Sequence, residues 1–248
     1  MTDRTVVVTG GTKGLGLAIT TRFLHAGATV ITCARRPPAE PTVVDGRGAT
    51  FVAADVRDAA QLETVVAAAT DATGRIDVLI NNAGGAPPAA AAESSASFNE
   101  KIIALNLLAP MNLSRACNEV MQSQPDGGVI INIASVSGMR ANPFGVAYGA
   151  AKAGLLNATE TLAVEWAPKV RVVAVTPGPL ATDALLDAMT DEAVDRISGA
   201  IALGRMGDTD EVANAVLFAA SPQASFITGT NIVVHGGPEW PGNGFPRR

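Results

Sequence analysis

Short runs of β-branched residues alternate with longer helix-like segments along the whole chain, and this alternation limits the fold more than any other feature. Seven such runs predict β-strands: Thr5–Thr9, Thr29–Cys33, Thr50–Ala54, Val78–Asn81, Val129–Ile133, Val170–Val175 and Asn231–Val234. Between them, as in Leu15–Ala26 and Leu62–Ala72, apolar residues recur at the helical period of three or four. Strands that alternate with helices predict an α/β fold with a parallel sheet. Because such crossovers are right-handed, we expect about seven strands in a doubly wound sheet with helices on both faces.

The chain is expected to form one domain over residues 1–248, because this length suits a single α/β unit and no composition break divides it. Arg36–Gly48 is interpreted as a connecting loop with a degraded helix. The longest late insertion, Pro177–Gly207, predicts a helical flap over the substrate at about 179–207. The tail at 238–248 is rich in Pro and Gly and is expected to be irregular.

Charge and apolar content exclude several classes of protein. The net charge of −5 argues against a nucleic-acid partner and against a basic membrane patch. No charged residue occurs in Val212–Pro238, but polar breaks at Ser221–Gln223 and Thr228–Asn231 predict helix, loop and strand instead of a membrane span. The first residues show no signal-peptide layout, so we expect a cytoplasmic protein.

No metal site is expected. Cys33 and Cys117 fit no metal or redox spacing and are interpreted as reduced, packed thiols. With only His25 and His235 as histidines, a His-based zinc site is disfavoured.

A glycine-rich segment, Thr9-Gly10-Gly11-Thr12-Lys13-Gly14-Leu15-Gly16, follows the first predicted strand and opens the first helix. Glycines in this position allow a tight turn and let a pyrophosphate approach the backbone and the helix N-terminus. The fourth strand ends in Asn81-Asn82-Ala83-Gly84. Ligands of doubly wound sheets bind outside the carboxyl ends of the strands, so both segments indicate a dinucleotide site.

Tyr148 and Lys152 are four residues apart on a predicted helix, which places both side chains on one face. A phenol with an ordinary pKa of about 10 is a poor base at neutral pH. A nearby ammonium favours the phenolate, so Lys152 is expected to lower the pKa of Tyr148 towards the range that acid/base catalysis needs. Tyr148 is the only tyrosine, so no other phenol could serve.

Two further polar residues are candidates for the same chemistry. Ser135 lies at the end of the fifth strand, where its hydroxyl can polarise a carbonyl, and Ser137 is the nearby alternative. Asn106 falls inside a long helix-like stretch, Phe98–Met121, although asparagine disfavours helix interiors. A functional role, a local kink and an exposed position all stay open for it.

In combination, these segments resemble the short-chain dehydrogenase/reductase family in its single-domain subclass. The resemblance runs from Thr5 to about Gly237 and rests on six features in order: TGGTKGLG at Thr9–Gly16, NNAG at Asn81–Gly84, Asn106, Ser135, YGAAK at Tyr148–Lys152 and PGPLAT at Pro177–Thr182. It implies a Rossmann-type sheet, a nicotinamide cofactor and a catalytic tetrad of Asn, Ser, Tyr and Lys. In that tetrad Tyr148 is the acid/base and Ser135 orients the substrate oxygen. Lys152 binds the nicotinamide ribose, and Asn106 holds a water in the proton relay.

The resemblance implies that the cofactor is bound mainly by three parts of the chain. These are the glycine-rich loop, Asp55, which resembles the family's adenine-contacting Asp, and the Pro177–Thr182 segment, which contacts the nicotinamide end. The predicted cofactor-binding residues are Gly10, Thr12, Lys13, Gly14, Leu15, Gly16, Arg35, Asp55, Val56, Asn82, Ala83, Gly84, Tyr148, Lys152, Pro177, Gly178, Leu180 and Thr182. The chain departs from the family in having His235 where an Asp usually precedes the terminal Gly-Gly. Its tail is also longer than a minimal member needs.

NADP(H) is predicted over NAD(H), which stays as the alternative. Members that prefer NAD carry an acidic residue at the end of the second strand. Here Ala34 takes that place and Arg35 follows, and an Arg accommodates a 2′-phosphate. Lys13 adds a second positive charge near Gly14.

The resulting hypothesis is an oxidoreductase that interconverts a secondary alcohol and a ketone. A 3-oxoacyl thioester reductase and an NAD-dependent hydroxy-compound dehydrogenase are the alternatives. A non-catalytic nucleotide sensor has no need of the Tyr-Lys pair. An α/β-hydrolase would need a G-x-S-x-G elbow, which is absent from the chain. An enoyl-reducing enzyme is disfavoured as well, because the enoyl-reducing members of the family have a wider Tyr–Lys spacing than the four residues found here.

Three mostly apolar loops, Gly85–Ala92, Met139–Phe144 and Pro179–Leu203, are expected to build the substrate pocket. They suit an apolar ketone or alcohol, or an acyl thioester. Two predicted helices, Phe98–Met121 and Tyr148–Trp166, have more apolar surface than one sheet can cover. Surplus apolar surface usually marks an interface between subunits, so we expect a homotetramer. The residues concerned are Leu105, Leu108, Met111, Leu113, Leu155, Leu156, Leu162 and Trp166.

Overall fold

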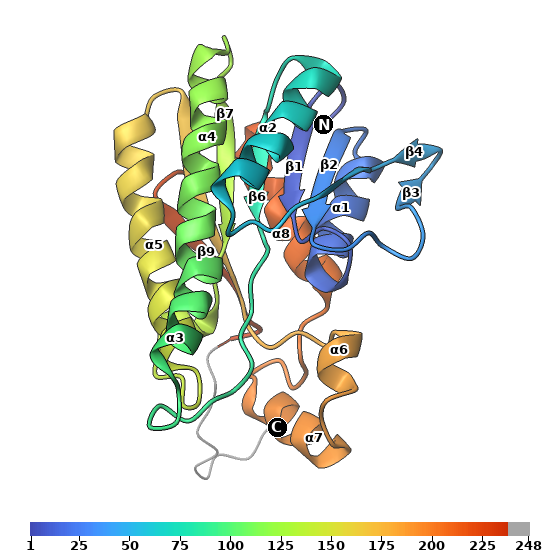
Figure 1. The fold of residues 1–248 in the computed structure, drawn as a ribbon. Coiled ribbons are helices and arrows are strands. Elements are labelled where there is room, and N and C mark those ends of the chain that lie inside the picture. The colour runs from blue at the N-terminus through green and yellow to red at the C-terminus, as the bar shows by residue number, and fades with distance from the viewer. Residues whose placement is uncertain (238–248) are drawn as a thin grey trace.

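The computed structural model of the chain describes residues 1–237. Its centre is a seven-stranded sheet in the order β5-β2-β1-β6-β7-β8-β9, with every neighbouring pair parallel (Figure 1). The strands are β1 Thr5–Thr9, β2 Thr29–Ala34, β5 Thr50–Ala53, β6 Val78–Asn81, β7 Gly128–Ile133, β8 Val170–Pro177 and β9 Thr230–Val234. The predicted Rossmann-type sheet is therefore confirmed. The strand order is built outwards from β1 on one side (β2, β5) and from β6 on the other (β7, β8, β9). Ligands of doubly wound sheets bind at such a switch point, so a ligand is expected in the crevice at the carboxyl ends of β1 and β6.

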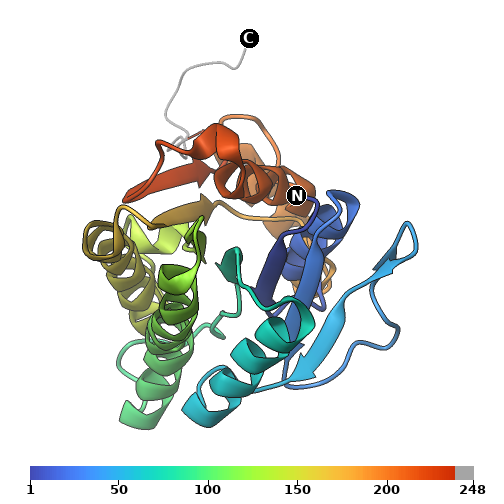
Figure 2. The same cartoon turned by 90° about the horizontal axis from the view of Figure 1, so that it is seen from above.

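Helices cover both faces of the sheet, as Figure 2 shows. α1 (Gly14–His25) and α8 (Thr209–Ala220) cover one face, and the other carries α2 (Ala59–Thr73), α4 (Ala109–Ser123) and α5 (Val146–Trp166). Alternation along β1 divides its side chains between two cores. Val6 and Val8 pack with α1 and α8, whereas Val7 packs with α2 and α4.

The segment 36–48 was predicted as a loop with a degraded helix, and this was wrong. It contains an antiparallel hairpin of β3 (Val43–Val44) and β4 (Arg47–Gly48). Asp45 and Gly46 form its two-residue turn with φ of 50° and 75°. Asp-Gly is a preferred pair for such turns, because both central residues need positive φ.

The predicted continuous helix Phe98–Met121 is also corrected. The structure divides it into α3 (Ala96–Ile103), a π-helical turn η1 (Ala104–Leu108) and α4. Asn106 lies in the π turn and is fully buried, so it is not exposed. Pro110 lacks the N–H that an α-helix would direct at the Asn106 carbonyl, which favours the interruption. Single π turns often occur at functional sites.

The insertion between β8 and α8 contains two short helices, α6 (Asp183–Leu186) and α7 (Asp191–Ala200). Figure 1 shows both at the lower end of the molecule, beyond the sheet. A bridge between Leu180 and Gly207 joins the two ends of the insertion. Short 3-10 turns occur at η2 (Val136–Gly138) and η3 (Pro222–Ala224). The predicted irregular tail lies outside the described residues.

The apolar residues assigned to an oligomer interface do not all lie at the surface. Leu113 and Leu155 are each 1% exposed and belong to the core, because α4 and α5 pack these positions against the sheet. Leu108 and Met111 are exposed, at 47% and 39%. Over residues 1–237, no helix combines the length and the apolarity needed to cross a membrane.

Candidate active site

The glycine-rich loop exposes backbone at the carboxyl end of β1, where α1 begins. Gly10 has φ of +65°, a conformation that glycine adopts without strain. Gly16 is needed for a different reason, because a Cβ there would lie 2.1 Å from the Gly10 carbonyl oxygen and 2.5 Å from Asn82 Nδ2. The two glycines therefore let the loop pack tightly against the start of α1, and a helix N-terminus of this kind favours a phosphate group.

A cavity of about 350 Å³ opens beside this loop. Most of the residues predicted to hold a nucleotide line it, from the ends of β1, β2, β5 and β6: Gly10, Lys13, Leu15, Gly16, Arg35, Asp55, Val56, Asn82, Ala83 and Gly84. Eight predicted cofactor residues are not among its lining residues: Thr12, Gly14, Tyr148, Lys152, Pro177, Gly178, Leu180 and Thr182. Cys33, Ala34, Ala54, Arg57 and Leu105 complete the wall and were not predicted.

Arg57 is the most consequential of these additions. Its guanidinium contacts the Asp55 carboxylate through Nε–Oδ1 at 2.9 Å and Nη2–Oδ2 at 2.5 Å. This pairing lowers the pKa of Asp55 to about 2. The cavity wall thus carries three cationic side chains, Lys13, Arg35 and Arg57, with Asp55 already paired. The Asp-x-Arg spacing could have indicated this ion pair.

Hydrogen bonds fasten the end of β6 to the glycine-rich loop. The Thr9 hydroxyl oxygen accepts from the backbone N–H groups of Asn82 at 3.0 Å and Ala83 at 2.9 Å. In return, Asn82 Nδ2 donates to the Thr9 carbonyl at 2.9 Å. The side chain of Asn82 therefore fixes the geometry of the crevice between β1 and β6.

Asn106 holds the next residues of the same loop. Its Oδ1 accepts from Gly85 N at 2.8 Å, and its Nδ2 donates to Gly85 O at 3.0 Å and to Ile102 O at 2.9 Å. A Cβ on Gly84 would lie 2.7 Å from Asn106 Oδ1 and 3.4 Å from Lys152 Nζ. The π turn therefore brings Asn106, Gly84 and Lys152 together.

Tyr148 and Lys152 extend from the first turns of α5 towards the end of β7. Lys152 is 3% exposed, and its ammonium donates to Ile133 O at 2.7 Å and lies 5.8 Å from the centroid of the Tyr148 ring. The Ser135 side chain lies next to the Tyr148 phenol and lowers its pKa by favouring the ionised form. Ser137 has another role, because its backbone N–H donates to Ser135 Oγ at 3.2 Å.

Burial controls the proton affinities of this pair. It raises the pKa of Tyr148, and the neighbouring Ser135 side chain, which favours the phenolate, only partly offsets this. The expected lowering of the Tyr148 pKa is therefore wrong for this structure, because desolvation of the phenolate dominates. Burial also lowers the pKa of Lys152 to about 8.

Comparison with known proteins shows the family of the chain. The family model described as "Enoyl-(Acyl carrier protein) reductase" matches residues 10–239. The chain belongs to the short-chain dehydrogenase/reductase family. It is 33% identical over 246 residues to the L-rhamnose 1-dehydrogenase (NAD(P)(+)) of Azotobacter vinelandii, covering 95% of this chain and 96% of the relative. It is 32% identical over 248 residues to the 3alpha-hydroxysteroid dehydrogenase of Mediterraneibacter gnavus, covering 94% and 96%.

A solved structure shows the same fold. The ligand-free aldohexose dehydrogenase of Thermoplasma acidophilum superimposes with a TM-score of 0.89 at 29% identity, covering 99% of this chain and 98% of that one. Enzymes of this family use nicotinamide cofactors and act on alcohol groups of small molecules. The chain is therefore an oxidoreductase of the short-chain dehydrogenase/reductase type.

In this dehydrogenase the segment after β8 lies next to the glycine-rich loop. A Cβ on Gly14 would be 3.9 Å from Thr182 Cγ2, and the Thr182 hydroxyl caps α6 by accepting from Leu185 N at 3.3 Å. Gly178 N donates to Val234 O at 2.9 Å, which ties the segment to the end of β9. His235 packs behind it, because a Cβ on Gly178 would be 2.8 Å from His235 Cβ.

A second cavity of about 290 Å³ lies between the η2 turn and the flap of the dehydrogenase. Its wall is mostly apolar and consists of Val136, Met139, Arg140, Pro179, Ile201, His235 and Gly237. Leu180, another predicted cofactor residue, lines a neighbouring cavity instead. His235 Nδ1 accepts from Gly237 N at 3.1 Å, so its ring is held by the backbone.

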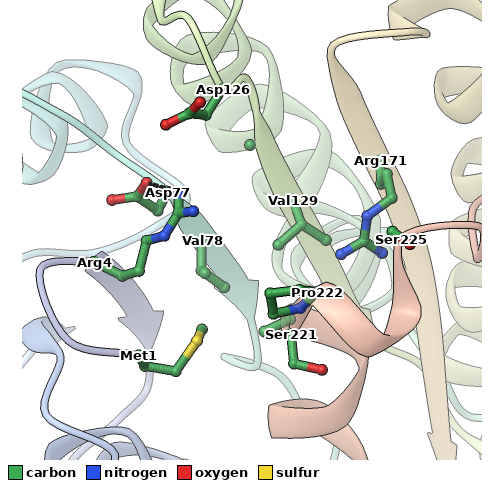
Figure 3. Close-up of a pocket in the computed structure, with 12 residues that line it drawn as sticks. Met1, Arg4, Asp77, Val78, Asp126, Val129, Arg171, Ser221, Pro222 and Ser225 are labelled. Atoms are coloured by element: carbon green, nitrogen blue, oxygen red, sulfur yellow. Dashed lines mark hydrogen bonds and ion pairs between the residues drawn. The ribbon is translucent and has the colours of Figure 1, made fainter.

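A further cavity, drawn in Figure 3, lies at the amino ends of the strands, opposite to the site. Asp77 accepts from Arg4 and Arg75 there, with the shortest contact to each at 2.6 Å. Arg171, on the other side of this cavity, donates to backbone carbonyls at 2.9 Å. Asp77 and Arg171 thus have partners within the protein, at the amino ends of β6 and β8.

Sequence reasoning also missed a buried amide network between the sheet and the helices of the site. Asn81 Nδ2 donates to Asn132 Oδ1 at 2.8 Å and to Ser114 Oγ at 2.9 Å. Asn132 Nδ2 donates to Thr159 Oγ1 at 2.9 Å. The network couples β6 and β7 to α4 and α5. Within residues 1–237, His, Cys, Asp and Glu form no group of three or more that could hold a metal ion.

Proposed function

We propose that this dehydrogenase interconverts a secondary alcohol and a ketone with NADP(H), through a tetrad of Asn106, Ser135, Tyr148 and Lys152. One observation carries the proposal. The phenol of Tyr148 lies next to the Ser135 side chain, which favours its ionised form, and beside the buried ammonium of Lys152, at the carboxyl edge of the sheet and close to the cavity at the glycine-rich loop.

The described residues fit a dinucleotide. Gly16 leaves no room for a side chain between the start of α1 and Gly10, which keeps the loop tight, and the cavity continues from the glycine-rich loop to Asp55. We assign the pyrophosphate to the glycine-rich loop, the adenine to Asp55 and Val56, and the nicotinamide end to Pro177, Gly178 and Thr182. Leu180 and Thr12 belong to the same assignment. When bound, the cofactor supplies or accepts the hydride.

The tetrad residues then handle the substrate oxygen and its proton. Ser135 donates a hydrogen bond to the ketone oxygen. Because burial raises the pKa of Tyr148, its phenol is protonated at neutral pH and donates the proton as the alcohol forms. Lys152 stabilises the resulting phenolate by its charge. Asn106 fixes the loop at Gly85 and is proposed to hold the relay water.

The preference for NADP(H) rests on charge. Lys13, Arg35 and Arg57 line the cavity, and Ala34 stands where an acid would repel a 2′-phosphate. The A. vinelandii relative is named for both nucleotides, so NAD(H) stays as the alternative for this chain.

The substrate proposed is a small apolar alcohol or ketone. The relatives named above act on sugars and on a hydroxysteroid, and the apolar second cavity favours the latter type. A 3-oxoacyl thioester is the second candidate, because the matching family model is named for acyl-carrier chemistry. The Tyr–Lys spacing of four is our reason for proposing carbonyl rather than enoyl reduction. We also propose a homotetramer, whose interface would use the exposed Leu108 and Met111.

The test is a screen of ketones and secondary alcohols, read by nicotinamide absorbance with NADPH, NADH and their oxidised forms. The proposal expects turnover of at least one apolar pair, with a higher kcat/KM for NADP(H). Turnover of an enoyl thioester alone would contradict it, and so would hydrolysis without any change in nicotinamide absorbance.

A further inference from the structure

Phe144 has an unusual backbone conformation close to the proposed acid/base. Its φ is +63°, which is an outlier for a bulky side chain because the Cβ crowds the backbone. Glycine would adopt the same conformation without strain. Strained positions of this kind persist only where the surroundings impose them, and they cluster at functional sites.

The strain is maintained by a contact between two loops of the site. Ala89 N donates to Phe144 O at 2.8 Å, which joins the loop after β6 to the loop before α5. Phe144 also lines a narrow cleft that Ala89, Phe98 and Tyr148 share. The backbone at 144 is therefore fixed four residues before the proposed acid/base.

The phenyl ring itself contributes little to the fold. Phe144 is 66% exposed, and Met139, on the same loop, is 50% exposed. A strained residue that is mostly exposed gains little in packing over glycine, which indicates a benefit of the ring outside fold stability. Exposed apolar side chains grouped at a site indicate a binding surface.

We propose that Phe144 is a specificity-determining residue whose ring supports one face of an apolar, ring-shaped alcohol or ketone. The inference rests on the proposed function. A flat, rigid ring buries the most surface against a phenyl face and loses little conformational freedom on binding. A sugar carries hydroxyls around its ring, and burying them in the mostly apolar second cavity without hydrogen-bond partners is costly. Val136, Met139 and Ile201 in the second cavity receive the rest of the molecule.

Kinetics with three alcohols test this inference: decahydro-2-naphthol, which has two apolar rings, 2-butanol, which has none, and L-rhamnose, whose ring is polar. We expect the wild-type protein to prefer the first. Phe144→Leu and Phe144→Gly should each lower kcat/KM for decahydro-2-naphthol about tenfold, by raising KM. Each should change kcat/KM for 2-butanol less than twofold. Phe226→Leu is the matched control, because Phe226 is fully exposed and lies outside every cavity wall described above. It should change neither value.

Thermal unfolding supplies a readout that does not depend on activity. Phe144→Gly should raise Tm by about 2 °C, because it relieves the strain, whereas Phe144→Leu keeps a Cβ at positive φ and should not. Unchanged discrimination between the alcohols in both variants would overturn the inference and leave the proposed function standing. A wild-type preference for L-rhamnose would overturn the inference together with the apolar substrate of the proposed function. Absence of turnover with every alcohol would overturn the proposed function as well.

Discussion

Replacing Lys152 by methionine should stabilise the protein at neutral pH while abolishing its activity. The ammonium of Lys152 is 3% exposed, and burial lowers its pKa from 10.5 to about 8. A shift of this size corresponds to about 3 kcal/mol of unfavourable free energy for the charged form. Methionine removes that cost but also loses the hydrogen bond to Ile133 O, which contributes about 1–2 kcal/mol. The variant should therefore be more stable by about 1–2 kcal/mol at pH 7.

The stability difference between the wild-type protein and Lys152→Met should change with pH in a defined direction. Above pH 8 the folded protein releases the Lys152 proton, while the unfolded chain keeps it until about pH 10.5. The unfolded state then binds more protons, so the stability of the wild-type protein rises with pH through this window relative to the variant. The advantage of Lys152→Met should shrink by about 2 kcal/mol between pH 7 and pH 9.5.

Urea unfolding followed by circular dichroism at both pH values measures this difference directly. Lys169→Met is the matched control, because Lys169 also donates to a backbone carbonyl, Gln122 O at 2.7 Å, but is exposed. The difference in free energy of unfolding between Lys169→Met and wild type should be the same at both pH values. The reasoning about Lys152 is refuted if the difference in free energy of unfolding between Lys152→Met and wild type is the same at both pH values. It is also refuted if Lys152→Met is less stable than wild type at pH 7 by several kcal/mol.

Two other substitutions test the nucleotide cavity. Gly16→Ala places a Cβ 2.1 Å from the Gly10 carbonyl oxygen, so it should cost about 1–3 kcal/mol of stability and prevent NADP(H) binding, as measured by thermal unfolding and fluorescence titration. A variant that binds the nucleotide normally would show that the loop can move apart. Arg35→Asp should shift the ratio of kcat/KM values towards NAD(H) because an acid repels the 2′-phosphate, and an unchanged ratio would mean that Arg35 is only a surface charge.

The layout of the sheet was predictable from the sequence because buried parallel strands need continuous Val and Ile runs, such as Val6–Val8. The glycine-rich loop was predictable for a related reason, since only glycine allows such close approach to Gly10 O. The hairpin at Val43–Gly48 was missed although Asp45-Gly46 is a turn signature. Two-residue strands carry too little periodicity to stand out between charged and proline-rich residues.

Other features depend on tertiary contacts that a single sequence does not show. The π turn at Asn106 depends on the side chain's bonds to Gly85, which is 21 positions away. The pKa of Tyr148 was predicted in the wrong direction because its burial exceeds the influence of a lysine at i+4. Arg57 enters the cavity wall only because β5 pairs with β2 and brings its end next to Arg35.

Tyr148→Phe tests the central claim most directly, because it removes the phenol oxygen and keeps the ring. The measurement is kcat/KM for the best alcohol or ketone, together with the Kd for NADP(H). The account predicts a fall of about 10²–10⁴-fold in kcat/KM, with the Kd for NADP(H) within about threefold of wild type. Activity within a few-fold of wild type would contradict the assignment of Tyr148 as the acid/base.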